Sequence, residues 1–203
     1  VAVTGVQTCA LPIFVDELLE AGIPPMGTLY HWDLPQALQD RGGWANRETA
    51  YAFASYAEKV AARLGDRVEQ WVTLNEPWCV AWLGYMSGVH APGIKNLDQA
   101  LAAAHHTALA HGLATRAIRS ASSTANVGLA LNMTNYRVDD PGNADLSTLA
   151  DLMDAHVNRW WLDAFTIGAY PRALTDFYGP KLQAHIEPGD EDILRDRKST
   201  RLN

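Results

Sequence analysis

The sequence predicts an α/β fold that forms part of a (β/α)8 barrel, and three observations support this class. Extended and helical segments alternate along the chain, which implies parallel strands joined by right-handed crossovers. Neither Gly-x-Gly-x-x-Gly nor a P-loop occurs, so an open nucleotide-binding sheet is disfavoured. Polar and aromatic residues follow the extended runs, as at the active-site face of a barrel; they are His31-Trp32-Asp33, Asn75-Glu76-Pro77 and Asn132 to Asn135. A whole barrel needs roughly 250 residues, so we expect these 203 to form a fragment of one.

The first strand and the first long helix are predicted over residues 26–31 and 46–64. Pro24 and Pro25 disfavour a helix before residue 26. From residue 46 to residue 64, apolar residues repeat on one helical face. We expect Asn46 to cap this helix and Gly65 to terminate it.

The second strand, the second long helix and the third strand follow in that order. Residues 68–74 are rich in β-branched and aromatic side chains, and Pro77 stops the strand they form. Asn96 is placed to cap an alanine-rich helix over residues 97–119. Residues 126–131 form the third extended run.

Two further helices are predicted toward the end of the chain. Residues 145–168 carry one apolar helical face, on which Trp160 and Trp161 are expected to be core residues. Residues 191–195 begin another helix.

Composition excludes several classes of protein. The chain has 23 acidic and 16 basic residues, a formal charge of −7, and no basic patch for a nucleic-acid backbone. It contains no run of about eighteen apolar residues, which a membrane helix requires. We expect a soluble protein with no nucleic-acid or membrane partner and, by default, a cytoplasmic location. The oligomeric state is not indicated.

The two ends differ in character from the middle. Residues 1–13 and 196–203 resemble translated sequencing-adapter sequence, and we expect them to be a non-native leader and a non-native tail. The alternative is an ordinary start and end of a natural domain. The folded part of the barrel is then expected over residues 14–195.

Glu76 is the main candidate for chemistry. It ends a strand, and Pro77 is expected to keep its backbone extended. Strict alternation sends Asn75 and Glu76 to opposite faces, so both reach one site only if the strand end twists or bulges. Desolvation by Trp78 and Trp82 would favour a protonated carboxyl that acts as general acid. The alternative is a structural glutamate that caps the next helix or faces solvent.

His31 and Trp32 end the first strand, where the histidine can donate to a sugar hydroxyl and the tryptophan can pack on a sugar face. The alternative is a structural histidine. His105, His106 and His111 lack metal-ligand spacing, so no metal is expected. Cys79 has no visible histidine partner, so a thiol nucleophile is not expected.

Three segments resemble bacterial β-glucosidases of glycoside hydrolase family 1, and the resemblance extends from about Phe14 to about Leu194. The segments are TLYHWDLPQALQDRGGW at 28–44, VTLNEPW at 72–78 and GYMSGVHAPG at 84–93. The resemblance implies that Glu76 is the acid/base, that Asn75 binds the 2-hydroxyl of the glycone, and that His31 binds another hydroxyl. It places Trp78 and Cys79 near the aglycone side.

The resemblance also implies a retaining mechanism with a second carboxylate as nucleophile. That glutamate belongs to a Glu-Asn-Gly motif, which does not occur in these 203 residues. We therefore expect the chain to supply strands three to five of the barrel. Alone, this fragment should be inactive and poorly soluble. The expected substrate is a β-glucoside or an oligosaccharide, and no cofactor is expected. A β-galactosidase, a β-fucosidase, a 6-phospho-β-glycosidase and a non-catalytic sugar-binding module remain alternatives, as does an adhesion or scaffold role.

Overall fold

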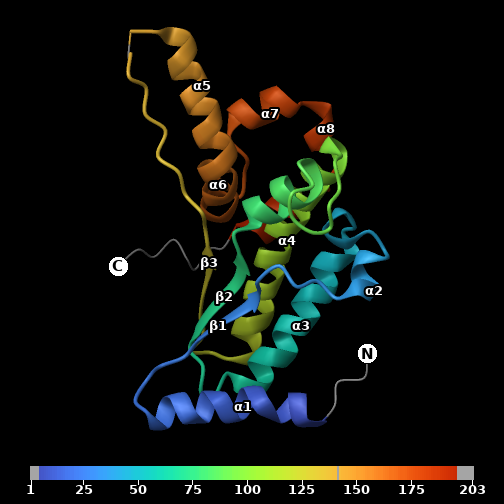
Figure 1. Cartoon of the computed structure of the whole chain (residues 1–203), viewed down its shortest axis with the longest axis vertical. Helices are drawn as coiled ribbons and strands as arrows, with labels where there is room; N and C mark the ends of the chain where they lie inside the picture. Colours follow the sequence, from blue (N-terminus) through green and yellow to red (C-terminus); the bar gives the residue numbers. More distant parts are fainter. Residues whose placement is uncertain (1–4, 141, 196–203) are drawn as a thin grey trace.

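Over the residues that the structure describes, three parallel strands form one sheet in the order β1-β2-β3. The computed structural model describes residues 5–140 and 142–195 (Figure 1). The strands are β1 (Met26–Tyr30), β2 (Gln70–Asn75) and β3 (Asn126–Ala130). Met26 pairs with Gln70, which pairs in turn with Asn126, so the three strands start level with one another. The predicted parallel sheet is confirmed.

Two long helices connect the strands and cover one side of the sheet (Figure 1). They are α3 (Glu48–Leu64), between β1 and β2, and α4 (Leu97–Ala121), between β2 and β3. Both helices bury alanines completely at the core, which allows close approach of their backbones; examples are Ala50 and Ala57 in α3 and Ala100 and Ala104 in α4.

The other helical segments are mostly short, and several of them were not predicted. They are α1 (Gly5–Glu20), α2 (Gln36–Gln39), the 3-10 turn η1 (Gly43–Ala45), the π-helix η2 (Cys79–Met86), α5 (Ala144–Asp154), the π-helix η3 (Ala155–Arg159), α6 (Trp160–Ile167), α7 (Arg172–Tyr178), α8 (Pro180–Gln183) and α9 (Asp190–Leu194). In the part of the chain that the structure describes, no helix is both long and apolar enough to cross a membrane.

The ends of the long helices follow the predicted capping with one difference. The Asn96 side chain accepts a hydrogen bond from the Gln99 N–H at 3.0 Å, as expected. Asn46 likewise accepts from the first residue of α3 at 3.0 Å. Gly65 ends α3 with a right-handed φ of −71°, not the left-handed conformation that usually favours glycine. A Cβ at Gly65 would lie 2.7 Å from the Cβ of Ser122, so close packing explains the glycine.

The predicted helix over residues 145–168 is interrupted. The π-helix η3 separates α5 from α6, and a π-turn carries an extra residue that sequence periodicity does not reveal. Trp160 and Trp161 are fully buried, which confirms them as core residues. Gly168 ends α6 with φ 76°.

The predicted terminal segments are only partly described. Helix α1 crosses the predicted leader boundary at residue 13, and its Val15 is buried against the core. The predicted tail, residues 196–203, lies outside the described residues. Both boundaries remain predictions.

Candidate active site

The carboxyl ends of β1 and β2 bring four predicted site residues together. The Asn75 side-chain amide donates to His31 Nε2 at 3.3 Å, and the Trp32 indole N–H donates to the Asn75 carbonyl at 2.9 Å. The Glu76 N–H donates to the Ala130 carbonyl at 2.8 Å, which ties the strand end to β3. These contacts confirm that the two strand ends are adjacent, as a parallel sheet requires.

The prediction of an extended backbone at Glu76 is wrong. Its φ is +47°, and among the described residues only Glu76 and Trp32 are non-glycine residues with positive φ. The Glu76 carbonyl accepts hydrogen bonds from the N–H groups of Cys79 (2.9 Å) and Val80 (3.3 Å), while its own N–H is held by β3. The chain therefore has to turn sharply at Glu76. Pro77 disfavours the right-handed conformation there, and the left-handed one satisfies both sets of bonds.

The strand end is also irregular, which was the condition for Asn75 and Glu76 to reach one site. The β2–β3 register shifts between Val72 and Asn75. A bulge of this kind re-aims the side chains that follow it. Both side chains are half-buried.

A thiol contacts the Glu76 carboxylate. Cys79 Sγ donates to Glu76 Oε2 at 3.5 Å and accepts from Asn132 Nδ2 at 3.6 Å. Burial, together with the hydrogen bond to Glu76 and its charge, raises the pKa of Cys79 to about 11. The thiol is therefore protonated at neutral pH, which makes it a hydrogen-bond donor and a poor nucleophile.

Trp32 lines a pocket beside the strand ends. Its ring centroid lies 5.0 Å from that of His90, in the loop after η2. The pocket has a volume of about 290 Å³ and is lined by Tyr30, Trp32, Cys79, Val80, His90 and Ala91. This volume is close to the lower end of the range for small-ligand pockets, about 300 Å³.

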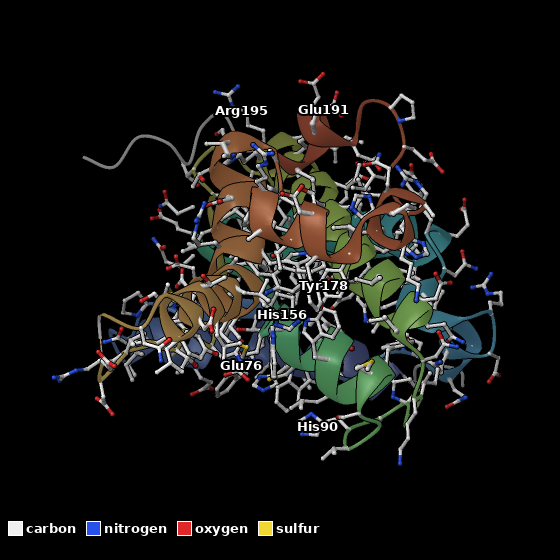
Figure 2. The ribbon with its side chains drawn as sticks, turned by 90° about the horizontal axis from the view of Figure 1, so that it is seen from above. Glu76, His90, His156, Tyr178, Glu191 and Arg195 are labelled. Atoms are coloured by element: carbon white, nitrogen blue, oxygen red, sulfur yellow. The ribbon has the colours of Figure 1, made fainter. Side chains whose placement is uncertain are left out.

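His156, which the sequence analysis did not select, adjoins this site. Trp78 Nε1 donates to His156 Nδ1 at 3.2 Å, and the ring centroids of His156 and Trp82 lie 4.4 Å apart. In the view of Figure 2, His156 lies between Glu76 and Tyr178. The available signal was a histidine on the apolar face predicted for residues 145–168. The expected desolvation of the Glu76 carboxyl by Trp78 and Trp82 remains a prediction.

The three histidines that were considered for a metal site are buried, and each forms hydrogen bonds within the fold. His105 contacts Asp190 and Tyr170, each at 2.8 Å. His106 contacts the Trp44 carbonyl at 3.0 Å, and His111 contacts Thr73 at 2.7 Å. Across the described residues, no three His, Cys, Asp or Glu side chains are grouped to hold a metal ion.

The sequence profile of glycosyl hydrolase family 1 matches residues 12–200. The chain belongs to this family. The β-glucosidase of Agrobacterium sp. is 42% identical over 185 residues, which cover 89% of this chain and 40% of that protein. β-Glucosidase A of Acetivibrio thermocellus is 44% identical over 164 residues, 81% of this chain and 36% of that protein.

Solved family 1 structures share the fold. The psychrophilic β-glucosidase of Micrococcus antarcticus superposes with a TM-score of 0.88 at 48% identity and covers 92% of this chain. The β-glucosidase of Thermotoga maritima, solved with glucoimidazole, has a TM-score of 0.82 at 36% identity over 91% of this chain. This family 1 chain spans about 40% of their lengths. The predicted partial (β/α)8 barrel is confirmed.

Proposed function

We propose that this chain supplies the acid/base and part of the glycone subsite of a retaining β-glucosidase, with Glu76 as the acid/base. The observation that carries the proposal is the position of Glu76. It ends β2, next to a hydrogen-bonded pair formed by Asn75 and His31, in a family 1 chain whose curated relatives include β-glucosidases.

The proposed reaction has two steps, and Glu76 acts in both. It first protonates the glycosidic oxygen while a carboxylate from outside these 203 residues attacks the anomeric carbon. The Glu76 carboxylate then takes a proton from water, and the resulting hydroxide displaces the enzyme carboxylate from the sugar. The sharp turn at Glu76 supports this role, because both steps need the carboxyl in a fixed position.

Asn75 and His31 are proposed to bind sugar hydroxyls. The Asn75 amide donates to His31 Nε2, so the histidine proton is on Nδ1 and available to a hydroxyl. Trp32 is 38% exposed and offers a ring for the apolar face of a sugar. Trp78 is proposed to adjoin the aglycone.

A β-fucoside is the second candidate substrate. A relative from Bifidobacterium breve, 47% identical over 165 residues, is a bifunctional β-D-glucosidase/β-D-fucosidase. Comparing β-glucoside with β-fucoside hydrolysis decides between the two glycones. A cytoplasmic location remains a prediction.

A chimera tests the role of Glu76. Residues 14–194 replace the matching segment of the Agrobacterium β-glucosidase, which supplies the remaining strands. We expect this chimera to hydrolyse aryl β-glucosides and cellobiose. Glu76→Gln should lower kcat/KM for cellobiose by about 10²- to 10⁴-fold, because its leaving group requires protonation. Azide should restore turnover of a dinitrophenyl β-glucoside and yield β-glucosyl azide, because azide needs no general base.

Glu69→Gln is the matched control, since Glu69 is an exposed glutamate just before the same strand. It should leave the kinetics unchanged. Parental rates in the Glu76→Gln chimera, or no glucosyl azide, would overturn the proposal.

A further inference from the structure

His156 is a half-buried histidine that the proposed reaction does not use. It lies in η3, inside a cluster of aromatic rings. The distances from its ring centroid to those of Trp82, Trp160 and Tyr178 are 4.4, 6.1 and 6.2 Å. Figure 2 shows it between Glu76 and Tyr178. It lies inside an aromatic cluster and is hydrogen-bonded to Trp78, two residues after the candidate acid, so its role calls for an explanation beyond packing.

His156 accepts the indole hydrogen bond of Trp78. The distance from Trp78 Nε1 to His156 Nδ1 is 3.2 Å. An indole N–H only donates, so His156 Nδ1 carries no proton. Burial lowers the pKa of His156 to about 4, so the imidazole keeps this acceptor at neutral pH. The Trp78 N–H is therefore already paired and is not offered to a ligand.

Two π-helices contribute side chains to this aromatic cluster. His156 belongs to η3 and Trp82 to η2, and their rings are in contact. π-Helical turns are rare and frequently occur at functional sites. The Asn158 side chain also fixes η3 in place, since it donates to the Thr134 carbonyl at 2.7 Å and accepts from the Thr134 N–H at 3.0 Å. His156 is thus held by the segment that follows β3.

We propose that His156 is a positioning residue that fixes the orientation of the Trp78 ring and thereby selects flat, aromatic aglycones. The inference rests on the proposed function. Trp78 is half-buried and follows Glu76 by two residues. Because its N–H is paired with His156, Trp78 offers only its ring surface to the aglycone. The aglycone is the group that leaves when Glu76 protonates the glycosidic oxygen. A ring surface recognises an aromatic aglycone by stacking, whereas an alkyl aglycone gains less from it.

Two substitutions of His156 in the chimera separate the hydrogen bond from packing. His156→Phe keeps an aromatic ring and removes the acceptor, whereas His156→Gln keeps an acceptor. The readout is the ratio of kcat/KM for phenyl β-glucoside to that for hexyl β-glucoside. We expect His156→Phe to lower this ratio about fivefold, corresponding to an aromatic contact of about 1 kcal/mol. His156→Gln should restore most of it.

Trp78→Phe completes a double-mutant cycle, because it removes the N–H donor and keeps a ring. It should lower the ratio, and adding His156→Phe should lower it no further, since the two residues share one interaction. Any of three results would overturn the inference. The ratio could stay at the parental value in His156→Phe, or it could fall equally in His156→Phe and His156→Gln. The effects of the two substitutions could also add in the double variant.

A spectroscopic readout is independent of catalysis. In the ¹⁵N-tryptophan-labelled chimera, the indole N–H signal of Trp78 is identified by its loss in Trp78→Phe. His156→Phe should shift this signal toward the position of a non-hydrogen-bonded indole, and an unmoved signal would contradict the inference. Failure of the proposed function appears separately, as a chimera that hydrolyses β-glucosides without needing Glu76.

Discussion

The positive φ at Glu76 links backbone geometry to the chemistry of a single residue. A left-handed conformation costs a non-glycine residue roughly 1–2 kcal/mol, and here the hydrogen bonds to β3 and η2 hold it in place. Strained residues of this kind cluster at functional sites. The turn gives the Glu76 carboxylate a fixed position, in contact with the Cys79 thiol.

The Cys79–Glu76 contact can be tested through the thiol. With Cys9→Ser, Cys79 is the one remaining thiol of the chain. Its rate of alkylation by iodoacetamide should rise continuously through pH 10, because its pKa is raised to about 11. Glu76→Gln should lower this pKa by removing a negative charge, yet leave it above the ordinary value of about 8.5 because burial is the largest cause.

Two results of the alkylation experiment would contradict the contact between Cys79 and Glu76. They are an alkylation rate that levels off by pH 8 and a pKa of Cys79 that is the same in Glu76→Gln. Glu69→Gln again serves as the control for loss of a remote carboxylate.

At the scale of elements, one buried carboxylate connects α9 to α4 and to the residue that precedes α3. Asp190 accepts from His105 of α4 at 2.8 Å, from Arg47 at 3.0 Å, and from the Glu187 N–H at 2.8 Å. Burial alone would raise the pKa of Asp190, but these hydrogen bonds outweigh it and hold the pKa well below its usual range. The ionised form therefore stabilises the fold.

Removing this carboxylate should destabilise the protein strongly. Asp190→Ala removes the carboxylate that binds both Arg47 and the buried His105, and we expect a loss of about 3–5 kcal/mol in the free energy of unfolding at pH 7. Glu58→Ala, an exposed position on α3, should change it by less than about 0.5 kcal/mol. Urea titrations of the chimera measure both values.

The pH dependence follows from the sign of the shift. Because the pKa of Asp190 is depressed in the folded state, its contribution is complete above the unfolded pKa of about 3.9 and declines as the pH falls below it. Asp190→Ala should therefore lose less stability at pH 3 than at pH 7. An equal loss at both pH values would show that the charge is not what stabilises α9.

At the scale of the whole molecule, the described part of the chain covers the sheet on one side only. Thr28 and Gly128 are exposed and Val72 between them is half-buried, and these three residues are aligned across the strands. Among the described residues, the outer edges of β1 and β3 also pair with no further strand. In a complete barrel, neighbouring strands pair with such edges.

This open face should make the 203-residue chain associate with itself. Light scattering should show a mass that increases with concentration, because unpaired edges and uncovered faces bind other chains. Thr28→Lys with Val72→Lys should reduce the association, since charges on the face oppose contact. Ser55→Lys on exposed α3 is the charge-matched control and should have no effect. A monomer at every concentration would contradict this expectation.

The sequence by itself determined the features that depend on local patterns. The strands and the two long helices were predictable because apolar periodicity, Asn96 and the proline positions act over a few residues. The strand-end motifs also allowed His31, Asn75 and Glu76 to be selected, since parallel strands end at one edge.

Only the tertiary structure decided what those residues contact. The left-handed turn at Glu76 depends on a hydrogen bond to β3, and the pairing of Trp78 with His156 joins residues 78 positions apart. The contact between Arg47 and Asp190 spans 143 positions. No local periodicity encodes such pairs, because each forms only after the sheet and its helices bring distant segments together.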